Sequence, residues 1–377
     1  MSGARVQGSD RKAYLDWLRG VGVLVMIQGH VIDSWTTAAD RNRDAYHWIT
    51  FVGGIGGAPV FLFLAGVAVV LGAEARVRRG RTEAEAAALA RRRGWQILGL
   101  AFLFRLQSWI ISGGPARTLL KVDILNVMGL SMVVAALFLG AGGRRLRALL
   151  YAVAAVAIAM TTPLVRTWEG LAVLPDPVEA YLRPAAGAAT FTLFPWAGFL
   201  LAGGAVAAWL DTKEPGRERR VILGVTAAGG ALALGGYLAS FLPAIYSQTS
   251  FWTSSPTFFF VRVGILMMLL GAAYAWHVRH GDPGVGATRR SPLRELGCAS
   301  LFVYWIHVEM VYGVLSAPLH RRLPLEWSYA AFLLFSLLMF ALVRLKNSSG
   351  QKAIRYVILA MRARLSIWPV RSSRLSL

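Results

Sequence analysis

The stretch Tyr14–Ile32, YLDWLRGVGVLVMIQGHVI, is typical of the segments that decide this fold. It is about as long as the roughly 20 mostly apolar residues that a helix needs to cross a bilayer. A basic segment precedes it, as in a signal peptide, but four polar residues interrupt it: Asp16, Arg19, Gln28 and His30. Because the apolar part of a signal peptide carries no such charges, we expect a retained transmembrane helix.

Apolar runs of this kind recur along the whole chain. Hydrophobic residues make up 56% of it, charged residues only 16%, and the mean hydropathy is +0.53, which excludes an ordinary soluble enzyme. We expect an all-α polytopic integral membrane protein with about ten transmembrane helices in one domain, residues 1–345. The expected helices lie near Tyr14–Ile32, Trp48–Leu71, Trp95–Ile111, Ile124–Leu139, Leu149–Thr162, Ala189–Leu210, Val221–Leu242, Phe258–Trp276, Ala299–Leu315 and Tyr329–Val343.

Residues 346–377 form a basic tail after the last apolar run. Within it Ile354, Val357, Ile358, Met361 and Leu365 recur at helical spacing, with basic residues between them. This pattern predicts an amphipathic helix on the cytoplasmic membrane surface. A disordered basic tail is the alternative.

The charge balance is strongly basic. The 40 Lys and Arg against 19 Asp and Glu give a net charge of +21, which in a soluble protein would suggest a nucleic-acid partner. Here the charges lie in short gaps between apolar runs, so we expect a lipid bilayer as the partner and no nucleic acid. With the N-terminus in the cytoplasm, the inner segments hold 29 basic residues and the outer segments eight. The positive-inside rule then predicts a multi-pass protein of the cytoplasmic (inner) membrane with both termini cytoplasmic.

Cysteine and metal-ligand patterns are uninformative. The one cysteine, Cys298, provides no disulfide framework, and the sequence contains no cluster of metal-ligand spacing. We therefore expect no metal site.

The first helix carries the densest set of polar groups. Arg19 and His30 are 11 residues apart, about three turns plus 20°, so both project from one face, about 16 Å apart along the axis. An Arg near the inner leaflet suits a phosphate or an internal carboxylate, and a His near the outer leaflet can accept a proton. The structural alternatives pair Arg19 with Asp16 and His30 with Asp33. Asp33 is also placed to orient the imidazole.

Further polar residues lie in or beside later apolar runs and are candidates for binding substrate or for internal pairing. Tyr304 and His307 share a polar stripe with Ser300, and such a stripe lines a site or joins helices. Arg262 lies inside the eighth run. Trp252 lies in an uncharged outer loop, where it suits stacking on a sugar face or a place in the aromatic belt.

Several motifs resemble the transmembrane acyltransferase superfamily, which includes the acyltransferase-3 proteins with their Arg-x10-His first helix. The motifs are Leu15-Asp16-Trp17-Leu18-Arg19-Gly20 followed by Gly29-His30, the run Pro59–Gly66, and Leu296–His307. Two more, Val122–Gly129 and Trp252–Phe259 with Arg262, look like the second branch, the heparan-α-glucosaminide N-acetyltransferase catalytic domain and its bacterial members. The likeness extends from about Tyr14 to Val343.

The resemblance implies acyl transfer across the membrane. An acyl group, expected to be acetyl, moves from cytoplasmic acyl-CoA, the cosubstrate, to a sugar hydroxyl or amine of a carbohydrate or glycolipid on the other side. In that scheme His30 takes the catalytic position with Asp33 near it, and Arg19 takes the inner position. Enzymes of the human type carry Asn where this chain has His30, so that role comes from the acyltransferase-3 side, and His47 is a second candidate.

Basic groups near the inner face have two interpretations. The arginine-rich inner loops are suited to the phosphates of CoA, notably Arg76, Arg78, Arg79 and Arg81 and the run Arg91-Arg92-Arg93, although the positive-inside rule alone would place them there. Arg105 lies inside the third apolar run instead, and we expect it to form a structural ion pair with Asp123.

Two other functions remain open. A secondary transporter of a small organic anion would use Arg19, Arg262 and His30 as substrate and proton sites, but no paired half-segments interrupted by Gly or Pro stand out. A non-catalytic scaffold fits poorly with three buried arginines. The sequence leaves the acceptor, the acyl chain and a homo-oligomeric state undetermined.

Overall fold

The structure is a computed structural model that describes residues 12–185, 187–210, 214–280 and 291–366, with residues 215 and 349–366 described by their backbone. In these ranges the chain forms helices and no strand, which confirms the expected all-α class. The α-helices are α1 Ala13–Trp35, α2 Asp44–Gly56, α3 Ala58–Arg78, α4 Glu83–Ser112, α5 Ile124–Leu137, α6 Arg144–Thr167, α7 Asp176–Leu182, α8 Leu193–Leu210, α9 Pro215–Ala239, α10 Pro256–His280, α11 Pro292–Cys298, α12 Ser300–Tyr312 and α13 Leu325–Ser366.

Seven helical segments of the described chain are long and apolar enough to cross a membrane, which confirms a polytopic membrane protein but not the count of ten. They are Ala13–Trp35, Asp44–Arg78, Arg144–Thr167, Leu193–Leu210, Gly216–Ala239, Pro256–His280 and Leu325–Ser348. The other three expected runs coincide with α4, α5 and α12. The helices α5 and α12 have only 14 and 13 residues, and α4 begins at Glu83, well before the expected start, with charged residues in its first half.

The expected helix over residues 48–71 is divided into α2 and α3 at Gly57. A Cβ at Gly57 would lie 2.7 Å from the carbonyl oxygen of Gly53, a contact that only glycine avoids. Pro59 then lies in the first turn of α3, where a missing N–H costs nothing. The break separates α2, which contacts α1, from the main length of α3, which packs on α8.

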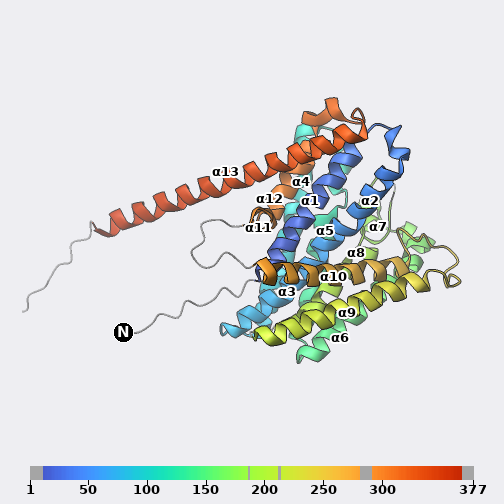
Figure 1. Ribbon diagram of the computed structural model, residues 1–377, viewed down its shortest axis with the longest axis horizontal. Helices are drawn as coiled ribbons and strands as arrows, with labels where there is room; N and C mark the ends of the chain where they lie inside the picture. Colours follow the sequence, from blue (N-terminus) through green and yellow to red (C-terminus); the bar gives the residue numbers. More distant parts are fainter. Residues whose placement is uncertain (1–11, 186, 211–213, 281–290, 367–377) are drawn as a thin grey trace, which may run out of the picture.

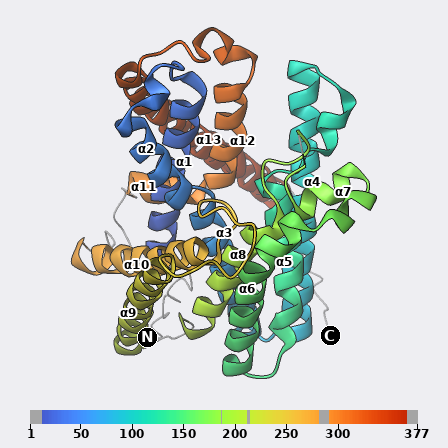
Figure 2. The same ribbon diagram turned by 90° about the vertical axis from the view of Figure 1, so that its right-hand side faces the viewer.

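Glycines hold α1 tightly against α11. A Cβ at Gly20 would lie 1.8 Å from the carbonyl oxygen of Leu293, and a Cβ at Gly297 would lie 1.9 Å from that of Asp16. The two backbones therefore touch, as small residues allow in membrane helices. This contact places α12, which follows α11, beside α1. Figure 2 shows α1, α2 and α12 on one side of the bundle and α4 to α6 on another, with α3 and α8 between them.

The last helix, α13, crosses the expected boundary between domain and tail. It continues as one helix from Leu325 to Ser366, visible as the long helix in Figure 1. The apolar stripe predicted for the tail, from Ile354 to Leu365, lies outside the described side chains, and residues 367–377 lie outside the described residues.

Candidate active site

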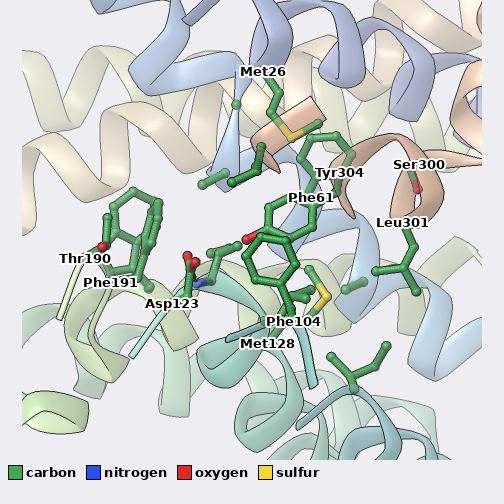
Figure 3. A pocket seen from close by; sticks show the side chains of 18 of the residues that line it. Met26, Phe61, Phe104, Asp123, Met128, Thr190, Phe191, Ser300, Leu301 and Tyr304 are labelled. Atoms are coloured by element: carbon green, nitrogen blue, oxygen red, sulfur yellow. Dashed lines mark hydrogen bonds between the residues drawn. The ribbon is translucent and has the colours of Figure 1, made fainter. Parts of the chain in front are cut away.

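A cavity of about 920 Å³, here called the main cavity, is lined by residues of α1 to α5, α8 and α12 and of the segment just before α8. Arg19, Arg76 and Arg93 line it where α1 begins, and His30 and Asp33 line it where α1 ends. From Arg19 to Asp33 the helix rises about 21 Å. Figure 3 shows part of the lining, with Phe104, Met128 and Tyr304 close together and Asp123, Thr190 and Phe191 to one side of them. The main cavity therefore extends along most of the length of α1.

The His30 side chain contacts a second histidine from α12. Nδ1 of His30 lies 2.8 Å from Nε2 of His307, and the two ring planes are within 3° of parallel. His307 is fully buried behind His30 and does not line the main cavity, whereas His30 does. The sequence placed both residues among the candidates, and the structure brings them together.

The hydrogen bonds of this pair determine which ring nitrogens carry protons. Nδ1 of His307 lies 2.8 Å from the carbonyl oxygen of Val303, which can only accept, so this nitrogen donates. In the neutral ring Nε2 of His307 is then an acceptor, and Nδ1 of His30 must donate to it. His30 is left with the lone pair on Nε2, the atom that a general base needs.

Asp33 has partners other than His30. The Tyr312 hydroxyl donates to its carboxylate at 3.1 Å, and Nη1 of Arg41 lies 3.7 Å away. Arg41 also donates to the Asp33 carbonyl oxygen. The partner that orients the His30 imidazole is thus His307, and Asp33 joins the end of α1 to α12 through Tyr312.

The Arg19 side chain fits both interpretations drawn from the sequence, an ion pair with Asp16 and a position at a ligand site. Its guanidinium donates to the Asp16 carboxylate at 3.1 Å, and it also lines the main cavity. The Asp16 side chain is only 4% exposed, whereas that of Arg19 is 21% exposed. Asp16 therefore supports a guanidinium that borders the open space.

The predicted pair of Arg105 and Asp123 is confirmed. Nη2 of Arg105 donates to the Asp123 carboxylate at 2.7 Å, and both residues line the main cavity. The Asp123 carboxylate also accepts a hydrogen bond from the backbone N–H of Ile124, the first residue of α5, and so caps that helix. The Tyr304 ring lies near Phe104, with centroids 5.8 Å apart, and borders the same space.

Two candidates lie elsewhere. Trp252 and Arg262 line a second cavity of about 720 Å³ and not the main cavity. Nη2 of Arg262 donates to the Trp252 carbonyl oxygen at 3.2 Å. His47, the second candidate base, lines this second cavity as well.

Sequence reasoning missed two residues of the site. Tyr312 and Arg41 hold Asp33, and Tyr312 also lies edge-on to the His30 ring at 5.5 Å. Arg41 is one of the eight basic residues of the outer segments, and its position in the chain gives no sign of a contact with Asp33. Tyr312 follows His307 by five residues, so the sequence predicts that both lie on one helix. No local pattern predicts the contact of Tyr312 with α1.

These features define a class: a helical membrane protein in which one cavity joins arginines at one end to a pair of contacting histidines at the other. The family described as heparan-alpha-glucosaminide N-acetyltransferase, catalytic, matches residues 11–242. Because the match covers more than half of the chain, the protein belongs to this family of membrane acetyltransferases, and the resemblance drawn from the motifs is confirmed. No curated protein matches the chain. The match includes Arg19, His30 and Asp33, whereas Arg262, Tyr304 and His307 follow it.

Proposed function

We propose that the protein transfers an acetyl group from cytoplasmic acetyl-CoA to a hydroxyl or amine of a carbohydrate acceptor on the other side of the membrane. The observation that carries the proposal is that Arg19 and His30 line one cavity, about 16 Å apart along α1. A donor held at the arginines can extend its acyl end toward the histidine without leaving this cavity.

The arginine end suits the phosphates of CoA. Guanidinium groups donate several hydrogen bonds to phosphate oxygens and stay charged at any physiological pH. Arg19, Arg76 and Arg93 come from three different helices and border the same space. They would bind the nucleotide part of the donor.

The histidine end suits the proton transfer. The acceptor oxygen or nitrogen attacks the thioester carbonyl carbon while Nε2 of His30 takes the acceptor proton. Collapse of the intermediate breaks the carbon–sulfur bond, and the departing CoA thiolate takes a proton from the His30 imidazolium. His307 accepts the Nδ1 hydrogen bond of His30 throughout and keeps its ring in place.

The direction of transfer depends on the orientation of the protein. The excess of basic residues in the segments at the arginine end supports a cytoplasmic location for that end. Cysteine labelling tests this in a Cys298→Ala background with Arg81→Cys and an impermeant thiol reagent. Residue 81 should react only in inverted vesicles, and its labelling on intact cells would refute the orientation.

The activity is tested with purified protein, acetyl-CoA labelled in the acetyl group, and cell-envelope glycans. We expect free CoA thiol and labelled glycan in equal amounts, with both formed about 10²–10⁴-fold more slowly by a folded His30→Ala variant. In sealed vesicles, label that crosses the membrane without thiol release would instead identify a transporter. Absence of both thiol and labelled glycan would contradict the proposed acetyl transfer.

A further inference from the structure

The second cavity plays no part in the transfer step described above. Four aromatic side chains line it, Trp48, Phe51, Trp252 and Phe258. They pack against one another, with ring centroids 5.9 Å apart for Phe51 and Trp252 and 5.1 Å apart for Trp252 and Phe258. Trp48 and Trp252 are nevertheless 68% and 57% exposed. Exposed rings held in this way offer flat apolar surfaces on which a sugar ring can stack.

The second cavity also contains a half-buried cation without a carboxylate partner. Within the described residues Arg262 donates one hydrogen bond, to the Trp252 carbonyl oxygen, and its Nε is buried and unbonded. Its guanidinium lies over the Phe258 ring at 4.0 Å. By contrast, Arg105 and Arg147 each pair with a carboxylate. Because a desolvated cation is costly without a counter-charge, Arg262 is suited to an anionic group of a ligand.

One helix, α2, separates the second cavity from the main cavity. Asp44, Trp48 and Phe51, which share one helix face, line the second cavity, while Thr50 and Gly54 line both. A Cβ at Gly54 would meet no other atom within 4 Å. The two cavities therefore adjoin at Gly54, where α2 carries no side chain.

We propose that the second cavity binds the acceptor, and that this acceptor is a sugar with an anionic group, phosphate or carboxylate. Trp48 and Trp252 stack on the sugar ring, and Arg262 pairs with the anion. The reacting hydroxyl or amine passes Gly54 into the main cavity. This inference rests on the proposed function, because it assigns the acceptor of the same transfer reaction.

Binding of sugars in the absence of acetyl-CoA tests the inference separately from the transfer. The protein in nanodiscs is titrated with glucose, glucose 6-phosphate and glucuronic acid, and in a parallel arm with a polyprenyl-phosphate glucose in the nanodisc lipid. We expect an anionic sugar to bind about tenfold or more tightly than glucose, as a charged hydrogen bond predicts. Binding of the soluble probes identifies a soluble acceptor, and binding of the lipid-linked probe alone identifies a glycolipid.

Substitutions assign the preference to Arg262. Arg262→Gln should abolish the preference for anionic sugars, and Arg262→Lys should retain part of it. The matched control is Arg166→Gln, because Arg166 also has a buried, unbonded Nε but lines neither cavity. Equal binding of glucose and the anionic sugars, no binding of any probe, or a preference that survives Arg262→Gln would each overturn the inference.

Two further variants keep the test valid if Arg262→Gln does not fold. Trp252→Ala should weaken binding of neutral and anionic sugars alike. Gly54→Val should slow transfer about tenfold or more even when the protein is saturated with both sugar and acetyl-CoA, because it fills the wall between the cavities. Gly230→Val is its control, since a Cβ at that α9 position also meets open space. If Gly54→Val transfers at the rate of the Gly230→Val control, the acceptor does not pass Gly54 and the inference is wrong.

These measurements separate the two proposals. Anionic sugars that bind through Arg262 without any acetyl transfer would refute the proposed function alone. Transfer to a glycan with an unchanged acceptor KM in Arg262→Gln would refute the second-cavity site alone.

Discussion

The two ends of the main cavity present different chemistry along one helix. At the start of α1 the cavity is lined by arginines, which stay charged and cannot exchange protons near neutral pH. At the end of α1 it is lined by His30, whose lone pair on Nε2 is directed by the contact with His307. Donor binding and proton transfer are thus assigned to different residues, so variants at the two ends should affect different kinetic constants.

The largest effect is expected at the histidine end. His30→Ala should lower kcat by about 10²–10⁴-fold, the usual contribution of a general base, while acetyl-CoA still binds. His30→Gln should fail similarly because an amide cannot take the proton. Turnover is measured by thiol release and donor binding by calorimetry. If His30→Ala keeps wild-type turnover, the proposed mechanism is wrong and His47 becomes the next base to test.

A smaller effect is expected for the residue that positions His30. His307→Ala should lower kcat by up to about 10²-fold, since misplacing a catalytic group by an ångström costs that much, and should leave the KM for acetyl-CoA unchanged. His307→Gln should recover part of the rate, because its amide oxygen can accept from His30. Asp33→Asn is the control and should lower kcat only a few-fold. No rescue by Gln, or a larger loss in Asp33→Asn, would assign positioning to another residue.

At the arginine end the expected effect is on binding. Arg19→Ala should raise the KM for acetyl-CoA about tenfold or more with little change in kcat, because hydrogen bonds to charged groups contribute about 1.5–3 kcal/mol. Arg19→Lys should recover only part of the affinity for acetyl-CoA, because the ammonium group lacks the planar, several-donor geometry of the guanidinium. Asp16→Asn is the control, because it removes the charge of the partner that Arg19 pairs with but keeps the Arg19 guanidinium. Unchanged donor affinity in a folded Arg19→Ala protein would make Arg19 structural.

The smallest effect is expected outside both ends, at Asp40. A hydrogen bond from the Thr37 hydroxyl, with others from the Leu325 N–H and from Arg43, lowers the pKa of the Asp40 carboxyl. Because this pKa is lower in the folded than in the unfolded protein, the ionised carboxylate stabilises the fold at pH values above the unfolded pKa. That contribution is lost as the pH falls through the folded pKa. Asp40→Asn should therefore lower the Tm slightly at pH 7, and this difference should shrink at pH ~3, which lies below the ordinary Asp pKa and closer to the lowered folded value. A Tm difference that is just as large at the lower pH, or any loss of turnover, would contradict this.

Parts of the site were predictable because they depend on local spacing. Eleven residues make about three helical turns, so Arg19 and His30 had to share a face, and both line the main cavity. The pair of Arg105 and Asp123, 18 positions apart in successive apolar segments, was predictable because a cation inside a membrane segment needs a carboxylate partner. The contact of His30 with His307 was not, because it joins residues 277 positions apart and no local pattern encodes that distance.

By itself the sequence determined the class of the protein. In a bilayer every backbone N–H and C=O must be bonded within the protein, so long apolar runs can only become helices. It also determined the family, through motifs that are contiguous in the chain. Tertiary structure alone decided which partner orients His30, that Gly57 divides the second run, and that Trp252 and Arg262 line a separate cavity. These outcomes depend on how helices pack at close contacts such as Gly20 with Leu293, and packing joins faces that lie far apart in the sequence.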